Sequence, residues 1–207
     1  MKSTDIMIPS GYLPIAVFLA LLLAACTTTS TGTRFYQLAP LPLSPGPDAP
    51  DAKVLAFGPL TFPDYLKRPQ LVRRASDTTL TIDEFNRWVE ALDQSAPRVI
   101  ARNVDGLMSN LIVIPFRNRA VEAGYRLFGS VSEFEADASG RTVLVVQWGI
   151  THTAGGLTIP PRTDRYEAQA TPADDPTAVV DAMSDLLGQF SREIVTLIRA
   201  TILQAEQ

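Results

Sequence analysis

The stretch that decides the fold is DPTAVVDAMSDLLGQFSREIVTLIRATILQ, residues 175–204. Asp175 is a favourable helix N-cap residue, and proline suits the first helical position that follows it. Apolar residues then recur every three or four positions, which predicts one long helix with a continuous apolar stripe. A helix with a single apolar face must pack against another layer, so the rest of the chain has to supply that layer. The stripe comprises Val179, Met183, Leu186, Leu187, Phe190, Ile194, Leu197, Ile198 and Ile202.

The other segments predict a second helix and a sheet. The helix is expected from about residue 93 to residue 110, with Asp93 or Ser95 as its N-cap and Pro97 in its first turn. Runs rich in β-branched and aromatic residues favour strands. The fold class is therefore predicted to be α+β, with two layers: a mostly antiparallel sheet packed with two amphipathic helices. The predicted strands span residues 34–38, 54–62, 70–74, 78–82, 111–116, 125–137, 141–153 and 157–170.

Glycine, proline and aromatic residues refine this prediction. Gly58 and the proline after it indicate a bulged or edge strand at 54–62, and two adjacent prolines mark 157–170 as an edge. Five prolines in residues 39–52 predict an extended surface loop. Phe85 and Trp88 are expected to be large apolar anchors, and Trp148 is expected in the core.

The N-terminus has the anatomy of a bacterial export signal. The apolar run at residues 15–25 is too short for a spanning helix, which needs roughly 20 residues, and fits a signal-peptide core of about 7–15 residues. It ends at Leu23-Ala24-Ala25-Cys26, which resembles the lipobox, and Cys26 is the only cysteine. We therefore predict a lipoprotein signal peptide at 1–25, a covalent acyl and diacylglyceryl lipid (palmitate) on Cys26, a flexible tether at 26–33 and a single domain at 34–207.

Two other interpretations of this N-terminus remain open. The apolar run is also compatible with an uncleaved membrane anchor, or with a conventionally cleaved secretory signal beside an incidental Cys26. In the best-studied envelopes, an aspartate directly after the lipidated cysteine retains a lipoprotein at the inner membrane. Thr27 occupies this position, so we predict a lipid-anchored protein on the periplasmic face of the outer membrane of a Gram-negative bacterium.

Composition and side-chain chemistry do not favour catalysis or nucleic-acid binding. The formal net charge is −4 and the pI is about 5.0, so no basic nucleic-acid surface is expected. His152 is the only histidine and is predicted at a strand end, and Cys26 is assigned to lipidation. No catalytic residue, metal ligand or cofactor is therefore predicted. A tethered periplasmic hydrolase is an alternative with little chemical support.

Several motifs resemble the ABC-type transport auxiliary lipoprotein component family (PqiC/YmbA-like). The stretch YLKRPQLVRR at residues 65–74 is similar to the family's most recognisable segment, although Lys67 replaces its usual acidic residue. Other similar segments follow in the same order and cover nearly the whole domain. They are FNRWVEAL at 85–92, RVIARNV at 98–104, FEA at 134–136, VVQW at 145–148 and VDAMSDLL at 180–187.

The resemblance implies a non-catalytic periplasmic subunit of an ABC/MCE-type lipid transport system that links the inner and outer membranes. It implies an MCE-domain protein and an inner-membrane permease/ATPase complex as partners, and a homo-oligomeric ring as one arrangement of copies. A structural lipoprotein of outer-membrane assembly or integrity is the alternative. The candidate partner-docking residues are Tyr65, Leu66, Arg68, Arg73 and Arg74. The first two are predicted to protrude between prolines, and the arginines form a basic patch or, alternatively, an ordinary solvated strand edge.

Overall fold

The computed structural model of the chain describes residues 32–43, 52–116 and 122–203. The predicted signal peptide and Cys26 lie outside the described residues. From Thr33 onward the chain packs as one unit. Within the described residues, no helix combines the length and the apolar character needed to cross a bilayer.

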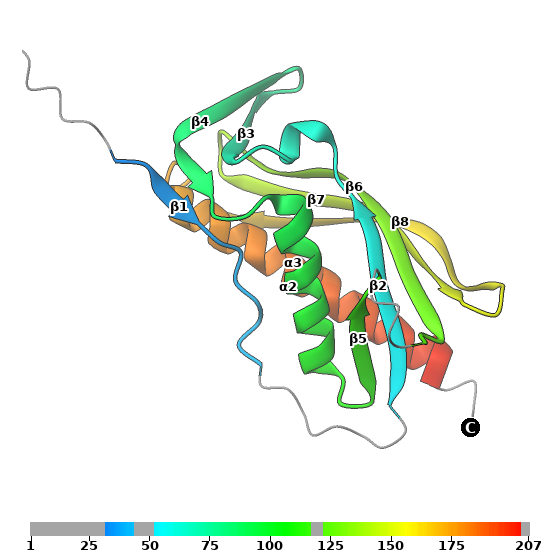
Figure 1. Cartoon of the computed structure of the whole chain (residues 1–207). Helices are drawn as coiled ribbons and strands as arrows, with labels where there is room; N and C mark the ends of the chain where they lie inside the picture. Colours follow the sequence, from blue (N-terminus) through cyan, green and yellow to red (C-terminus); the bar gives the residue numbers. More distant parts are fainter. Residues whose placement is uncertain (1–31, 44–51, 117–121, 204–207) are drawn as a thin grey trace, which may run out of the picture. The chain divides into compact units, whose positions relative to one another are not determined.

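The described residues form eight strands and two helices, which confirms the α+β fold class (Figure 1). A short 3-10 helix, η1 (Asp64–Leu66), joins the second and third strands, and the last helix continues into a π-helical turn, η2 (Arg199–Leu203). The main elements are β1 (Arg34–Tyr36), β2 (Lys53–Thr61), β3 (Gln70–Ser76), β4 (Thr79–Trp88), α2 (Leu92–Leu107), β5 (Leu111–Pro115), β6 (Tyr125–Asp137), β7 (Arg141–His152), β8 (Leu157–Gln169) and α3 (Pro176–Ile198).

The sheet branches at the long strand β6. One edge of β6 pairs with β7, in a register that runs from Tyr125 opposite His152 to Ala136 opposite Thr142. The other edge pairs first with β2 and then, at its end, with β3. One branch therefore continues from β2 to β5, and the other continues from β3 through β4 to β1 (Figure 1).

Strand directions are more mixed than the sequence predicts. The meander β6–β7–β8 and the hairpin β3–β4 are antiparallel, as expected. However, β2 is parallel to both β5 and β6, β3 is parallel to β6, and β1 is parallel to β4. Alternation of apolar residues shows which face of a strand is buried but not which strand lies beside it.

Two proline-containing strands test the edge predictions. The register of β2 against β6 shifts between Phe57 and Leu60, so the bulge at Gly58 is confirmed. The alternative that β2 is an edge strand is wrong, because it lies between β5 and β6. Among the described strands β8 pairs with β7 alone, which confirms it as an edge.

The two helices differ in how well their starts were predicted. Asp175 caps α3 as expected, because its Oδ1 accepts a hydrogen bond from the Thr177 amide at 3.0 Å. In contrast, α2 begins at Leu92 with Ala91 in the cap position and no side-chain cap. Asp93 and Ser95 both lie inside the helix, so the prediction of either as N-cap is wrong.

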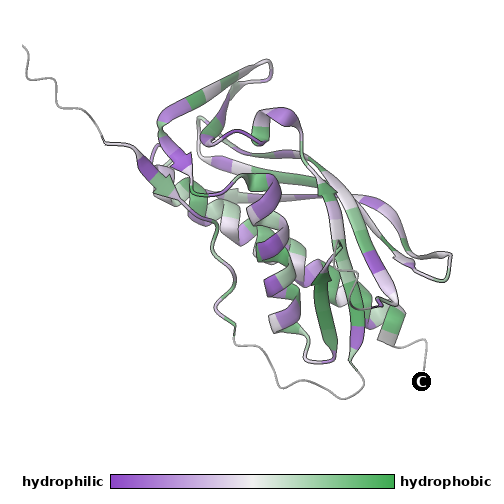
Figure 2. Cartoon of the chain, in the orientation of Figure 1, coloured by the Kyte–Doolittle hydropathy of each residue, from purple (hydrophilic) through white to green (hydrophobic). Residues whose placement is uncertain are grey.

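One hydrophobic core joins the helices to the sheet. Helix α3 packs against β6, β7 and β8, whereas α2 packs against β2, β5 and α3. On β7 the alternate residues Leu144, Val146, Trp148 and Ile150 are all at most 1% exposed and belong to this core. Figure 2 shows β5 as an almost wholly apolar strand beside α2, which carries both hydrophilic and hydrophobic residues. The polar residues Arg98 and Arg102 of α2 are exposed.

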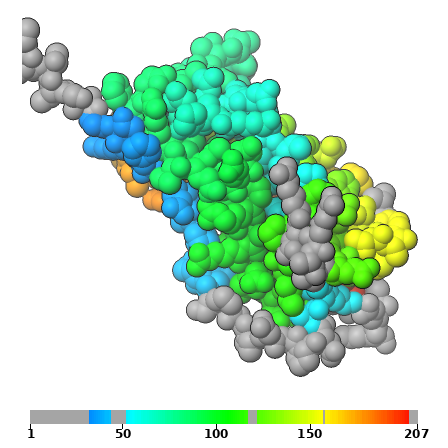
Figure 3. All heavy atoms as spheres, in the orientation of Figure 1, coloured from blue at the N-terminus to red at the C-terminus, as the bar shows by residue number. Residues whose placement is uncertain are grey.

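The segment at residues 37–43, which we call the strap, crosses both helices. The amide of Ala39 donates to Ser184 Oγ of α3 at 3.1 Å, and the amide of Leu41 donates to Asn103 Oδ1 of α2 at 2.7 Å. Gly188 of α3 permits this approach, since a Cβ there would lie 2.9 Å from Leu41 Cδ2. Residues 39–43 are therefore extended and exposed or partly exposed, as predicted for a surface loop, but they are held against both helices. Residues 44–51 of the predicted loop lie outside the described residues. Figure 3 shows the blue atoms of the strap beside the green atoms of α2.

Replacing Asn103 with alanine is expected to loosen the strap. Asn103 is 1% exposed, and its Nδ2 also donates to Ser191 Oγ at 3.3 Å. Its loss leaves the Leu41 amide without its acceptor, so we expect destabilisation of about 1–3 kcal/mol. Hydrogen exchange at the Leu41 amide and urea denaturation measure the two effects. Arg102→Ala, on the exposed side of the same helix, is the control, and unchanged exchange at Leu41 would contradict the prediction.

Candidate docking site

The YLKRPQLVRR stretch lies where the sheet branches. It forms η1 and the beginning of β3, at the point where the pairing of β6 passes from β2 to β3. The register of β6 against β7 also shifts here, between Val131 and Glu133. The Tyr65 hydroxyl donates to Glu135 Oε2 at 2.9 Å and lies 3.3 Å from the Ser132 carbonyl oxygen. The motif therefore stabilises the connection at which the pairing of β6 changes from β2 to β3.

Glu135 is the buried acceptor at the centre of this turn from β2 to β3. Its side chain is 3% exposed, and it accepts hydrogen bonds from Tyr65, from the Phe134 amide at 2.8 Å and from Arg74 Nε at 2.9 Å. A second Arg74 nitrogen, Nη2, makes the ion pair. Burial, and next the Glu135 charge, raise the pKa of Tyr65 well above its usual range, so the hydroxyl remains a donor.

The structure places the five predicted docking residues in different environments. Leu66 is 2% exposed and belongs to the core, so the expectation that it protrudes is wrong. Arg73 donates to the Asp137 carbonyl oxygen at 3.0 Å and to that of Ala173, and thereby ties β3 to the chain before α3. Tyr65 and Arg74 are engaged with Glu135, as described above. The docking role of Tyr65, Arg68, Arg73 and Arg74 stays a prediction.

Arg68 differs from the other arginines of the motif. Its side chain is partly buried, and its Nε has no hydrogen-bond partner among the described residues. A buried guanidinium nitrogen without an acceptor is uncommon, because desolvating it carries a cost. Of the docking candidates, Arg68 is therefore the one with a buried donor that has no partner among the described residues.

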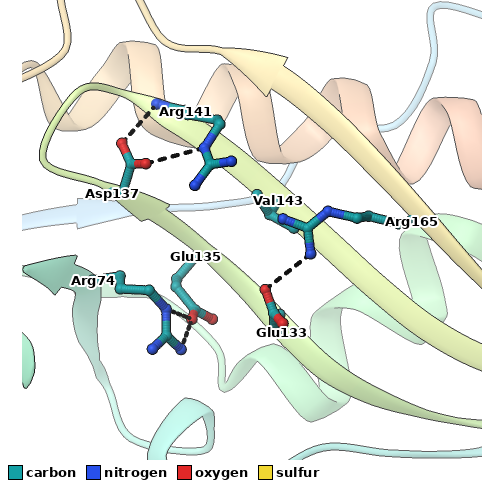
Figure 4. A pocket seen from close by; sticks show the side chains of 7 residues that line it. All are labelled: Arg74, Glu133, Glu135, Asp137, Arg141, Val143 and Arg165. Carbon is teal, nitrogen blue, oxygen red and sulfur yellow. Dashed lines mark hydrogen bonds and ion pairs between the residues drawn. The ribbon is translucent and has the colours of Figure 1, made fainter. Parts of the chain in front are cut away.

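Beside this turn, charged residues cover the face of the sheet opposite α3 (Figure 4). The hollow between them is only about 30 Å³, which leaves room for a water or two. Arg165 pairs with Glu133 at 3.4 Å, and Arg141 pairs with Asp137 at 3.1 Å. Burial alone would raise the pKa of Asp137, but hydrogen bonds from Ser139 and Arg141 outweigh it and lower the pKa. The charges therefore satisfy one another and form no evident ligand site.

The remaining sequence candidates have structural roles. No cluster of metal-binding side chains occurs within residues 32–43, 52–116 and 122–203. The exposed His152 ends β7, packs edge-on against Tyr125 and accepts the Ala154 amide at Nδ1 (3.1 Å), as expected for a strand-end residue. Trp88 and Trp148 are 4% and 0% exposed and confirm the core prediction, whereas Phe85 is 54% exposed and is not an anchor.

A concave surface lies beside α2, and no sequence motif predicts it. We call this surface the groove. Two adjoining hollows of about 700 and 440 Å³ share four lining residues, and such volumes are typical of binding sites for small molecules. The lining comes mainly from α2, β2 and β5, with Phe62, Lys67 and Phe116 from neighbouring segments, so only the folded chain brings it together. The shared residues are Phe57, Gln94, Pro97 and Pro115, and the charged residues of the lining are Lys67, Asp93, Arg98, Arg102 and Asp105.

The folded domain thus has a concave surface beside α2, a sheet face on which charged residues pair with one another, and a turn held by Glu135. The chain belongs to the family of ABC-type transport auxiliary lipoprotein components, whose profile matches residues 36–195. This membership confirms the resemblance carried by the YLKRPQLVRR stretch and the segments that follow it. The protein is accordingly a transport auxiliary component by family.

Relatives and solved structures agree with this assignment. The chain is 24% identical over 151 residues to the intermembrane transport lipoprotein PqiC of Escherichia coli and to that of Shigella flexneri, covering 72% of this chain and 80% of each relative. A crystal structure of an uncharacterized protein superimposes with a TM-score of 0.69 at 20% identity, over 81% of this chain and 99% of the other. A protein from Xanthomonas campestris gives 0.66 at 18% identity, over 84% and 99%. These structures support the fold.

Proposed function

We propose that this protein is a non-catalytic, lipid-anchored periplasmic subunit of an ABC/MCE-type lipid transport system that links the inner and outer membranes. The observation that carries the proposal is the family match across residues 36–195. The name of the PqiC relatives, intermembrane transport lipoprotein, supports the direction of the proposal. The lipobox-like sequence before Cys26 supports the anchor.

The short segment between Cys26 and the domain limits how far the anchored domain can reach from its membrane. The described unit begins at Thr33, which is seven residues after Cys26. Seven residues span at most about 25 Å when fully extended, and roughly 15 Å on average as a flexible coil. The domain therefore stays beside its own membrane. A partner has to bridge the periplasm, and this is the role proposed for the MCE-domain protein and the permease/ATPase complex.

Fractionation of the full chain tests the anchor. In a Gram-negative host, the wild-type protein is expected with outer-membrane markers, and Cys26→Ser is expected to abolish lipid attachment because the variant lacks the acceptor thiol. Thr27→Asp is the matched control, since it keeps the thiol and is expected to move the protein to the inner-membrane fraction. Metabolic labelling with palmitate reports the modification directly. Unchanged labelling of Cys26→Ser would overturn the anchor.

Crosslinking in intact cells tests the transport role. A bifunctional crosslinker followed by capture of the full-length protein is expected to recover an MCE-domain protein together with the permease or its ATPase. Recovery of outer-membrane assembly proteins without any MCE component would instead support the alternative of a structural lipoprotein. That result would contradict the transport proposal but leave the lipid anchor standing.

A further inference from the structure

Three large apolar side chains are exposed at one edge of the sheet. Phe35 is 64% exposed, Phe85 is 54% exposed and Val89 is 63% exposed. We call these residues the edge patch. Phe35 lies on β1, Phe85 lies on β4, and Val89 directly follows β4. An exposed cluster of this kind commonly marks an interaction surface, whereas isolated exposed apolar residues need no explanation.

The strand register explains why these side chains face outward. In the parallel pair β1–β4, Tyr36 lies opposite Trp88, and Phe35 lies opposite Arg87. Tyr36 and Trp88 both pack with the core, and the Tyr36 hydroxyl donates to Asn86 at 2.9 Å. Because side chains alternate across a strand, Phe35 must point away from the core. The outward direction is therefore fixed by a paired strand rather than by a loose chain end.

The edge patch lies next to the point where the tether enters the domain. Phe35 is two residues after Thr33, and it is nine residues after Cys26. Nine residues span at most about 30 Å, whatever conformation they adopt. A flexible coil of this length spans roughly 17 Å on average. The Val89 amide donates to the Tyr36 carbonyl oxygen at 2.9 Å, so the end of β4 is held beside β1. A lipid on Cys26 would thus keep all three residues near the bilayer surface.

We propose that the edge patch inserts into the headgroup–acyl boundary of the bilayer that anchors Cys26. The proposal rests on the lipid anchor of the proposed function, and it names the lipid surface as the occupant of the patch. Apolar side chains gain by leaving water at this boundary, and a lipid anchor combined with a second contact binds more firmly than a single acyl chain.

This contact would also orient the domain. In the strand order β1-β4-β3-β6-β2-β5, the edge patch lies at one end and β5 lies at the other. The groove beside α2 includes Pro115 and Phe116 at the β5 end. With β1 on the bilayer, the β5 end of the groove would be directed toward the periplasm, where a transport partner approaches.

Tryptophan fluorescence on vesicles tests the contact. The lipidated protein is purified from membranes as the Phe35→Trp variant and reconstituted into phosphatidylethanolamine–phosphatidylglycerol vesicles that contain a brominated phospholipid. The native Trp88 and Trp148 are 4% and 0% exposed, so they contribute a shielded background. The matched control is Ile112→Trp, which replaces a 40% exposed residue on β5 at the other end of the sheet. We expect at least threefold stronger quenching at position 35 than at position 112.

The outcomes separate this proposal from the lipid anchor. Vesicle-bound protein with equal quenching at both positions would overturn the membrane contact but leave the anchor intact. Protein that does not float with vesicles would overturn the anchor and the contact together. A tryptophan at position 35 that is shielded only as protein concentration rises would assign the patch to a second copy, and would also overturn the proposal.

Discussion

Replacing Trp148 with alanine is expected to lower the free energy of unfolding by about 3–5 kcal/mol, the range for deleting a large core aromatic. Trp148 is fully buried on the face of β7 that packs against α3. Its ring lies 5.4 Å from the ring of Phe190 in an edge-on arrangement. Its Nε1 donates to Asp164 Oδ2 of β8 at 2.8 Å. One residue therefore connects the sheet, the long helix and the edge strand.

The surroundings of Trp148 have little freedom to fill the resulting cavity. Gly129 of β6 lies opposite it, and a Cβ on this glycine would sit 3.1 Å from Trp148 Cβ and 2.5 Å from the Gln147 carbonyl oxygen. The backbones are thus already at contact distance. Trp148→Phe should retain most of the packing and lose the hydrogen bond, at a cost of about 1–2 kcal/mol.

Urea denaturation followed by far-UV circular dichroism measures both Trp148 variants without depending on tryptophan emission. Thr163→Ala, at an exposed position of β8, is the control and is expected to change stability by less than about 0.5 kcal/mol. A loss below about 1 kcal/mol for Trp148→Ala would show that the core can repack around the gap.

The parts of the fold that sequence could predict are those governed by neighbours along the chain. The apolar stripe, the Asp175 cap and the following proline locate the start of α3 because all three act within one helix. The bounds of β6 were predicted to the residue, since turns and alternation delimit it. Residue type alone predicted that both Phe85 and Trp88 are apolar anchors. Only the pairing of Trp88 with Tyr36 reveals which of them faces the core.

The parts that sequence could not predict depend on contacts between distant segments. The strap is held by Asn103 and Ser184, which lie 62 and 145 residues from their partners. Prolines in the strap predicted an extended chain correctly, but they carry no information about what that chain touches. The groove beside α2 likewise needs Phe57, Pro97 and Pro115 to meet in the folded domain. Conversely, the YLKRPQLVRR motif was recognised from sequence, whereas its role in bracing the branch of the sheet was not.

That role gives the second large expected effect. Glu135→Ala should destabilise the domain by about 3 kcal/mol, near the lower end of the range for breaking a buried ion pair. The substitution leaves Arg74, the Tyr65 hydroxyl and the Phe134 amide without their common acceptor. Because Arg74 is 31% exposed, water compensates part of its loss. The turn from β2 to β3 should open first, which hydrogen exchange around η1 would detect.

A double-mutant cycle with Arg74→Ala isolates the pair from the other donors. The stability losses of the two single variants should add up to about 1–3 kcal/mol more than the loss in the double variant. The reason is that the second substitution removes a group that is already unpaired. Glu133→Ala is the matched control, since this residue lies two positions away on the same strand and pairs with Arg165, with exposures of 39% and 44%. An exposed pair of this kind contributes about 0–1 kcal/mol. Equal losses for Glu133→Ala and Glu135→Ala would mean that burial does not distinguish the two carboxylates, and that the motif does not brace the branch of the sheet.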